Sequence, residues 1–80
     1  MNLSSAVATR IKELLKARNV TQYSFEHKAC IPHDTIKSIM RGKAKGVNLK
    51  TIAYIADGFD MTMSEFLDSD LFLYDNLELD

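Results

Sequence analysis

The sequence predicts an all-α domain built from five short helices. Apolar residues recur at intervals of three and four through most of residues 5–68, which is the pattern of amphipathic helices. Residue types that start helices precede these stretches, and the connections between them are short. Eighty residues suffice for one compact domain, and a hydrophobic fraction of 46% with 26% charged residues is ordinary for a folded chain.

The first two helices are predicted before residue 30. A helix from Ser5 to about Arg18, capped by Ser4 or Ser5, carries a stripe of apolar residues. They are Ala6, Val7, Ile11, Leu14 and Leu15. Thr21 then offers a side-chain oxygen as the cap of a second helix, which ends at Ala29.

The third helix, His33 to Met40, is predicted to begin after Pro32. Proline suits this place because it has no amide hydrogen to donate and disfavours helical geometry at the residue before it. The apolar residues of the helix repeat at three and four, and Gly42 closes it. The opposite face is polar and carries His33, Asp34, Lys37, Ser38 and Arg41.

The last two predicted helices follow a basic loop over residues 42–47. Asn48 caps a fourth helix that ends near Gly58. Thr62 and Glu65 have the spacing of a capping box, which starts a fifth, short helix that buries Phe66 and Leu67.

Residues 70–80 differ from the helices before them. Four leucines occupy odd positions there, namely Leu71, Leu73, Leu77 and Leu79. This alternation predicts an extended segment that is covered on one side. The chain is therefore expected to consist of a domain over residues 1–69 and an acidic, leucine-rich tail over residues 70–80.

Charge is divided unevenly along the chain, although the formal net charge is −1. All ten Lys and Arg residues lie before residue 51, and residues 1–56 contain three acidic residues. Residues 57–80 contain eight acidic residues and no basic one. A basic body with an acidic end is typical of a polyanion-binding face and a segment that stays off it. The alternative is a solvated surface on which the charges sort this way without a ligand.

Several functional classes are not expected. The single cysteine, Cys30, excludes an internal disulfide and offers no second thiol for a zinc site, so it is interpreted as a small buried residue. The sequence has no catalytic set of Ser, His and Asp and no glycine-rich phosphate loop, so we expect no enzyme, no cofactor and no metal. The sequence also shows neither the pattern of a signal peptide nor an apolar run long enough to span a membrane. It therefore predicts a cytoplasmic protein without a membrane partner.

Two short helices joined by a tight turn, the second polar outside and followed by basic residues, describe a helix-turn-helix. At this point the sequence also resembles the Cro and phage-repressor (Xre-type) helix-turn-helix family. The resemblance lies in residues 21–43, 48–57 and 63–67 and implies a five-helix, lambda-repressor-like fold. Members usually have a small residue in place of Glu26 and a glycine in place of Cys30. Glu26 is therefore expected to turn outward or pair with a basic group, and Cys30 to occupy a turn that often needs positive φ.

The resemblance and the shared outer face of the third helix predict a set of DNA-contacting residues. Those expected to reach base edges are His33, Asp34, Lys37 and Ser38. Those expected to contact phosphate are Arg10, Gln22, Thr35, Arg41, Lys43, Lys45 and Asn48. The alternative for both sets is an ordinary solvated surface.

The predicted function is sequence-specific binding of double-stranded DNA by a homodimeric transcriptional regulator, with the third helix in the major groove. The tail is expected to pack on the side away from DNA and to help form the dimer, or else to fold over the basic face and compete with DNA. The alternative function is a protein-interaction module, of the antitoxin or phage accessory type, that binds a protein partner through the tail.

Overall fold

A computed structural model describes residues 1–79, and these residues form helices and turns without a β-strand. The five helices are α1 (Leu3–Ala17), α2 (Gln22–Ala29), α3 (His33–Met40), α4 (Leu49–Gly58) and α5 (Met63–Leu67). Two 3₁₀ turns follow, η1 (Asp70–Phe72) and η2 (Tyr74–Asn76). The all-α, five-helix prediction is confirmed.

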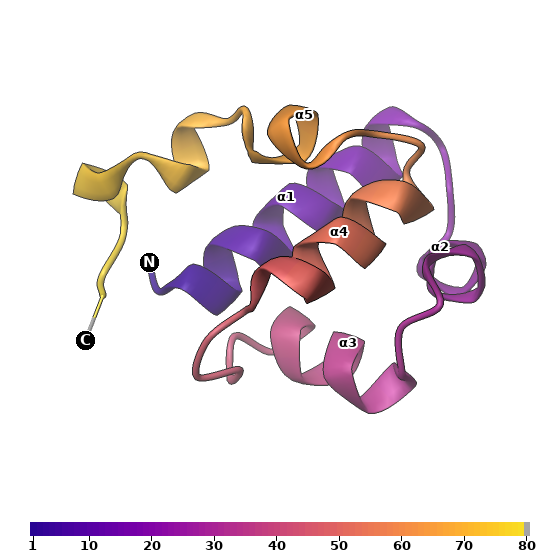
Figure 1. The fold of residues 1–80 in the computed structure, drawn as a ribbon, viewed down its shortest axis with the longest axis horizontal. Coiled ribbons are helices and arrows are strands. Elements are labelled where there is room, and N and C mark those ends of the chain that lie inside the picture. Colours follow the sequence, from indigo (N-terminus) through magenta and orange to yellow (C-terminus); the bar gives the residue numbers. More distant parts are fainter. Residues whose placement is uncertain (80) are drawn as a thin grey trace.

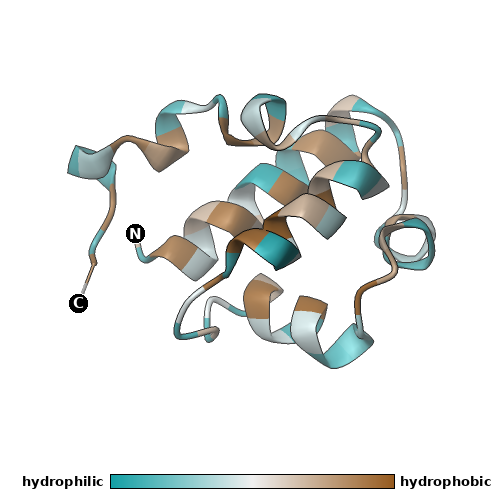
Figure 2. Ribbon diagram, in the orientation of Figure 1, coloured by the Kyte–Doolittle hydropathy of each residue, from teal (hydrophilic) through white to brown (hydrophobic). Residues whose placement is uncertain are grey.

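The helices pack around one core (Figure 1). Helix α1 packs against α3, α2 against α4, and α4 against α5. The core contains side chains from all five helices, and its largest buried members are Phe25, Phe66, Ile11 and Ile36. Phe25 of α2 stacks on Phe59, with ring centroids 4.4 Å apart. Figure 2 shows that the hydrophobic residues of α3 face the body of the molecule, which leaves its hydrophilic residues outside.

The start of α1 differs from the prediction. Asn2 is the N-cap, and its side-chain oxygen accepts a hydrogen bond of 2.7 Å from the amide of Ser5. Ser4 is 1% exposed, and its hydroxyl donates to the backbone oxygen of Ile39 at 3.1 Å. The predicted cap, Ser4 or Ser5, was wrong because the packing of α3 against α1 engages Ser4 from inside the core.

The end of α4 lies where it was predicted, but Gly58 is not its left-handed residue. Gly58 is buried, and a Cβ atom there would lie 2.8 Å from the Cβ of Ala29 and 2.9 Å from Cε1 of Phe25. Asp60 takes the left-handed conformation instead, with φ of 57°. The glycine therefore permits the close approach of α2 and α4.

Cys30 lies in the turn between α2 and α3 and is exposed, so the prediction of a buried cysteine was wrong. It ends α2 in the left-handed conformation, with φ of 56° and ψ of 37°. The next residue, Ile31, is 8% exposed and anchors the turn in the core. The positive φ expected at Cys30 is confirmed.

Residues 70–79 form two short turns where an extended segment was predicted. Phe72 packs against the core, with its ring centroid 6.1 Å from that of Phe66. Leu73 and Leu79 remain 55% exposed, so the leucines do not share one covered side. The amide of Glu78 donates to the backbone oxygen of Met1 at 2.9 Å, which ties the tail to the start of α1.

Candidate nucleic-acid interface

Helix α3 presents a polar outer face because its inner face is held in the core. Ile36 is fully buried and Ile39 is 2% exposed. The polar residues opposite them are exposed or half-buried, and they are His33, Asp34, Thr35, Lys37 and Ser38. This arrangement agrees with the predicted outer face of the third helix.

The loop after α3 is fixed at both sides of Gly42. Its φ of 70° allows the amide of Gly42 to donate to Ile39 and that of Lys43 to donate to Ser38, at 2.9 and 3.0 Å. The side chain of Asn2 donates to the backbone oxygen of Gly42 at 3.2 Å. The loop is thereby joined to the start of α1, while Lys43 and Lys45 remain exposed.

A shallow cavity of about 450 Å³ lies between α3, this loop and the start of α4. Among its lining residues are Asp34, Thr35, Ser38, Asn48 and Thr51. The side-chain oxygen of Asn48 accepts the amide of Thr51 at 2.8 Å, so only its NH₂ group remains to contact an anion. Sequence reasoning did not select Thr51, because its place in this cavity depends on the packing of α4 beside α3.

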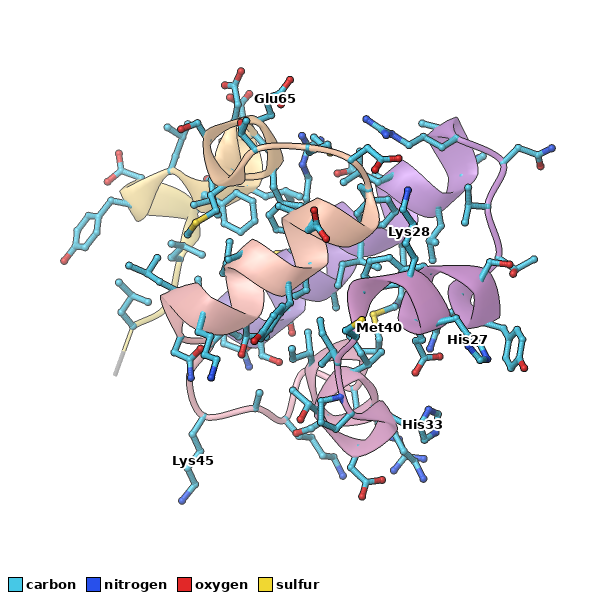
Figure 3. All side chains as sticks on the ribbon, turned by 45° about the vertical axis from the view of Figure 1, so that its right-hand side comes forward. His27, Lys28, His33, Met40, Lys45 and Glu65 are labelled. Carbon is cyan, nitrogen blue, oxygen red and sulfur yellow. The ribbon has the colours of Figure 1, made fainter. Side chains whose placement is uncertain are left out.

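Most of the predicted residues come together on this side of the molecule. Figure 3 shows His33 and Lys45 on the side of α3, and Glu65 on the opposite side. Residues from α3, the following loop and the start of α4 form the group, namely His33, Asp34, Thr35, Lys37, Ser38, Arg41, Lys43, Lys45 and Asn48. Gln22 is exposed as the first residue of α2, after the cap made by Thr21.

Arg10 does not join this group. Its Nε atom donates to the backbone oxygen of Phe66 at 2.7 Å, and its Nη2 atom donates to that of Glu65 at 3.0 Å. The guanidinium carbon also lies 5.9 Å from the centre of the Phe66 ring. These contacts hold the last carbonyl groups of α5, which lies on the far side of the body from α3 (Figure 1).

Glu26 was expected either to turn outward or to pair with a basic group, and the structure shows the pairing. Its Oε1 atom lies 2.8 Å from Nδ1 of His33. The pair links the middle of α2 to the first residue of α3. Family members usually have a small residue at this position. Here the position carries a longer, acidic side chain that contacts the first residue of α3.

The end of the tail lies beside the basic loop. Glu78 and Leu79 line a cavity of about 500 Å³ together with Lys43 and Lys45. The expectation that the tail stays clear of the basic residues was wrong for this part of the chain. The cause is the hydrogen bond of Glu78 to Met1, because the start of α1 adjoins the loop.

Metal-ligating clusters and membrane-spanning helices are both absent from residues 1–79. Within them, no three His, Cys, Asp or Glu side chains are grouped so that they could hold a metal ion. None of the helices in this part of the chain has the length and apolar character needed to cross a membrane.

A short helix anchored by its inner face, preceded by a tight turn and followed by a basic loop, is the arrangement of a helix-turn-helix DNA-binding protein. The chain matches the family described as the Cro/C1-type HTH DNA-binding domain over residues 10–70, and it belongs to that family. DNA binding in transcription regulation is the function of this class, which is not an enzyme family. Searches of curated proteins and of solved structures gave no significant match.

Proposed function

We propose that the protein regulates transcription by placing α3 in the major groove of a specific double-stranded DNA site. The observation that carries this proposal is the division of α3 into a buried apolar face and an exposed polar face. The residues proposed to reach base edges are His33, Asp34, Lys37 and Ser38. The major groove is about 12 Å wide, which admits a single α-helix.

The side chains on this face suit the donors and acceptors of base edges. Lys37 donates to O6 and N7 of guanine, and Asp34 accepts from N4 of cytosine. Ser38 donates or accepts. A set that contains both donors and acceptors discriminates among base pairs, whereas lysine and arginine alone favour any polyanion.

The phosphate contacts are assigned to residues at the margins of α3. The proposed residues are Gln22, Thr35, Arg41, Lys43, Lys45 and Asn48. Gln22 stands at the start of α2, where free amides and the helix dipole favour an anion. Arg10 is left out of the set, because its guanidinium is engaged with the end of α5.

We propose in addition that the protein acts as a homodimer on a two-fold symmetric site, with half-sites about 34 Å apart. The tail supports this proposal, since Leu73 and Leu79 are 55% exposed and Tyr74 is 78% exposed. Exposed apolar side chains close in sequence are suited to bury surface against a second protomer.

A comparison of two lysine variants tests the proposal. Lys37→Ala is expected to cost about 1–3 kcal/mol at the preferred site and to relax the choice of one base pair. Lys43→Ala is expected to weaken binding to all duplexes alike and to reduce the slope of log K against log salt by about 1. Binding is measured by fluorescence anisotropy over a range of salt. The same uniform loss from both variants would remove Lys37 from base readout.

The exposed tail residues also favour a second candidate, an interaction module that binds a protein partner through the tail. Retention on heparin or nonspecific DNA at low salt separates the two. The proposed DNA contacts predict retention that decreases steeply with salt. A chain that passes through unretained would favour the interaction module.

A further inference from the structure

A hydrogen bond between side chains crosses the turn of the helix-turn-helix. It joins Glu26 of α2 to Nδ1 of His33 at 2.8 Å, and within residues 1–79 it is the only side-chain hydrogen bond between α2 and α3. The Glu26 side chain is 16% exposed, whereas that of His33 is 71% exposed. His33 therefore keeps most of its ring open to solvent, at the outer edge of α3 (Figure 3).

We propose that Glu26 is a positioning residue, which holds the ring of His33 so that its Nε2 atom faces the DNA and selects the orientation of a base pair, with adenine or cytosine, the bases that bear an amino group, on the strand that the ring faces. The inference rests on the proposed function, because it takes α3 to lie in the major groove. It assigns a role to Glu26, which does not itself touch DNA.

The chemistry of the pair determines which ring nitrogen serves the DNA. An ionised carboxylate has only acceptor atoms, so the hydrogen of the contact belongs to Nδ1 of His33. In a neutral imidazole with its hydrogen on Nδ1, Nε2 is an acceptor. The donors that base edges offer in the major groove are N4 of cytosine and N6 of adenine. Every base pair carries one of these amino groups, so Nε2 distinguishes a base pair from the same pair reversed and does not by itself distinguish A·T from G·C.

The position of Glu26 makes it suitable as a support. Its neighbours Phe25 and Ala29 are 1% and 2% exposed, and both anchor α2 in the core. The carboxylate is therefore held by a rigid helix and not by a loop, as required of a group that fixes the geometry of another. A ring at the edge of a helix without such a partner would sample several rotamers and tautomers.

The charge of Glu26 predicts a different effect from its hydrogen bond. A carboxylate near DNA repels phosphate, so its removal alone raises the affinity for every duplex by a similar factor. Loss of the support of His33 instead changes the ratio of affinities between duplexes that differ at one base pair. The ratio is therefore the quantity that tests the proposal.

The experiment begins with selection of bound duplexes from a random pool by the full chain at about pH 8. Affinities are then measured for the selected duplex and for duplexes with each other base pair at the position that His33→Ala alters. Glu26→Ala is expected to reduce the preference there by about 3- to 10-fold, the factor that one hydrogen bond of ordinary net strength supplies. Glu26→Gln removes the charge but keeps an oxygen that can accept from Nδ1, so it should retain more of the preference. Preferences at the other positions should remain.

Glu13→Ala is the matched control. Glu13 is exposed on α1, beside residues of the tail, so its substitution makes the same chemical change away from His33. It is expected to leave the preference unchanged. Each preference is a ratio of two affinities of the same variant, so a lower folded fraction cancels from it.

The double variant Glu26→Ala/His33→Ala should select as His33→Ala does, because Glu26 acts through the ring. A uniform change for all duplexes in Glu26→Ala would overturn the inference and leave only a charge effect. Equal affinity of the wild type for each base pair and for the same pair reversed at the His33 position would also overturn it, while the proposed function would stand. A wild-type chain without any base preference would instead contradict the proposed function.

Discussion

At the end of α4, the left-handed conformation that glycine usually takes belongs to Asp60, and Gly58 lies in the packed interface with α2. Asp60 adopts the left-handed conformation, and the amide of Met61 donates to the backbone oxygen of Ala56 at 2.9 Å. The carboxylate of Asp60 also accepts from Lys28 of α2 at 2.5 Å. The glycine two residues earlier serves packing, because α2 lies directly over it.

Gly58→Ala is expected to lower the free energy of unfolding by about 1–2 kcal/mol. Alanine favours a helix by about 1 kcal/mol over glycine, but overpacking typically costs about 1–3 kcal/mol and more where the neighbour is rigid. Here the new Cβ would meet the Cβ of Ala29 at 2.8 Å, an atom that no side-chain rotation moves away. Urea unfolding followed by circular dichroism measures the change.

Gly46→Ala provides the control for this prediction. Nothing lies within 4 Å of a Cβ atom at Gly46, so its substitution should leave the free energy of unfolding unchanged or raise it by about 0.4–1 kcal/mol. Equal stability of Gly58→Ala and the wild type would show that α2 and α4 separate without cost.

At the scale of elements, the local signals of α2 and α3 were sufficient to predict them. Thr21 caps α2, and α3 covers the predicted range His33–Met40, since Pro32 and Gly42 limit it by their own backbone chemistry. The start of α1 and the form of the tail were not predictable in this way. They depend on contacts between residues far apart in the sequence, such as those of Ser4 with Ile39 and Glu78 with Met1.

The candidate site was predictable to a similar extent and for the same reason. The residues on α3 and in the following loop share one side because helix periodicity and the turn at Gly42 place them there. Arg10 was predicted to contact phosphate because it is a basic residue, but its guanidinium donates hydrogen bonds to backbone oxygens of α5. The pairing of Glu26 was anticipated, but its partner was not, because the crossing of α2 and α3 selects His33.

The capping box of α5 predicts a dependence of stability on pH. Hydrogen bonds from Thr62 lower the pKa of Glu65 from its ordinary value of 4.5. The bond from the backbone of Thr62 has the larger effect, and the bond with its side chain has the smaller one. A lowered pKa in the folded state contributes stability that is complete above the ordinary value and is lost as pH decreases through the lowered one. The Tm advantage of the wild type over Glu65→Gln is therefore expected to be largest at about pH 6 and to disappear towards about pH 3.

Thermal unfolding at several pH values provides this measurement. Lys28 lowers the pKa of Asp60 from 3.8 in the same direction, mainly through its hydrogen bond, so the wild type and Glu65→Gln both lose stability in acid. The informative quantity is their difference in Tm. A difference that is the same at both ends of the pH range would contradict the role of the Glu65 carboxylate.

At the scale of the whole molecule, the division of charge along the chain is only partly a division in space. Glu65 lies on the far side of the body from α3 (Figure 3), but Glu78 and Leu79 approach Lys43 and Lys45. The tail thus combines exposed apolar residues, suited to a second protomer, with carboxylates beside a proposed phosphate contact. These two properties have opposite effects on DNA binding.

A chain that ends at Leu73 separates the two effects. It keeps Phe72, which packs against the core, and removes the exposed Tyr74 and Leu79 together with the carboxylates at the end of the tail. On a duplex with a single half-site, its affinity is expected to increase about two- to fivefold at low salt, because surface charge pairs have small and screened effects. On a palindromic duplex, affinity should decrease, because the second half-site contact is lost with the dimer. Anisotropy on both duplexes and sedimentation of the free protein are the measurements. Unchanged dimerisation with tighter binding to both duplexes would assign the tail to competition with DNA alone, and weaker binding to the single half-site would exclude that competition.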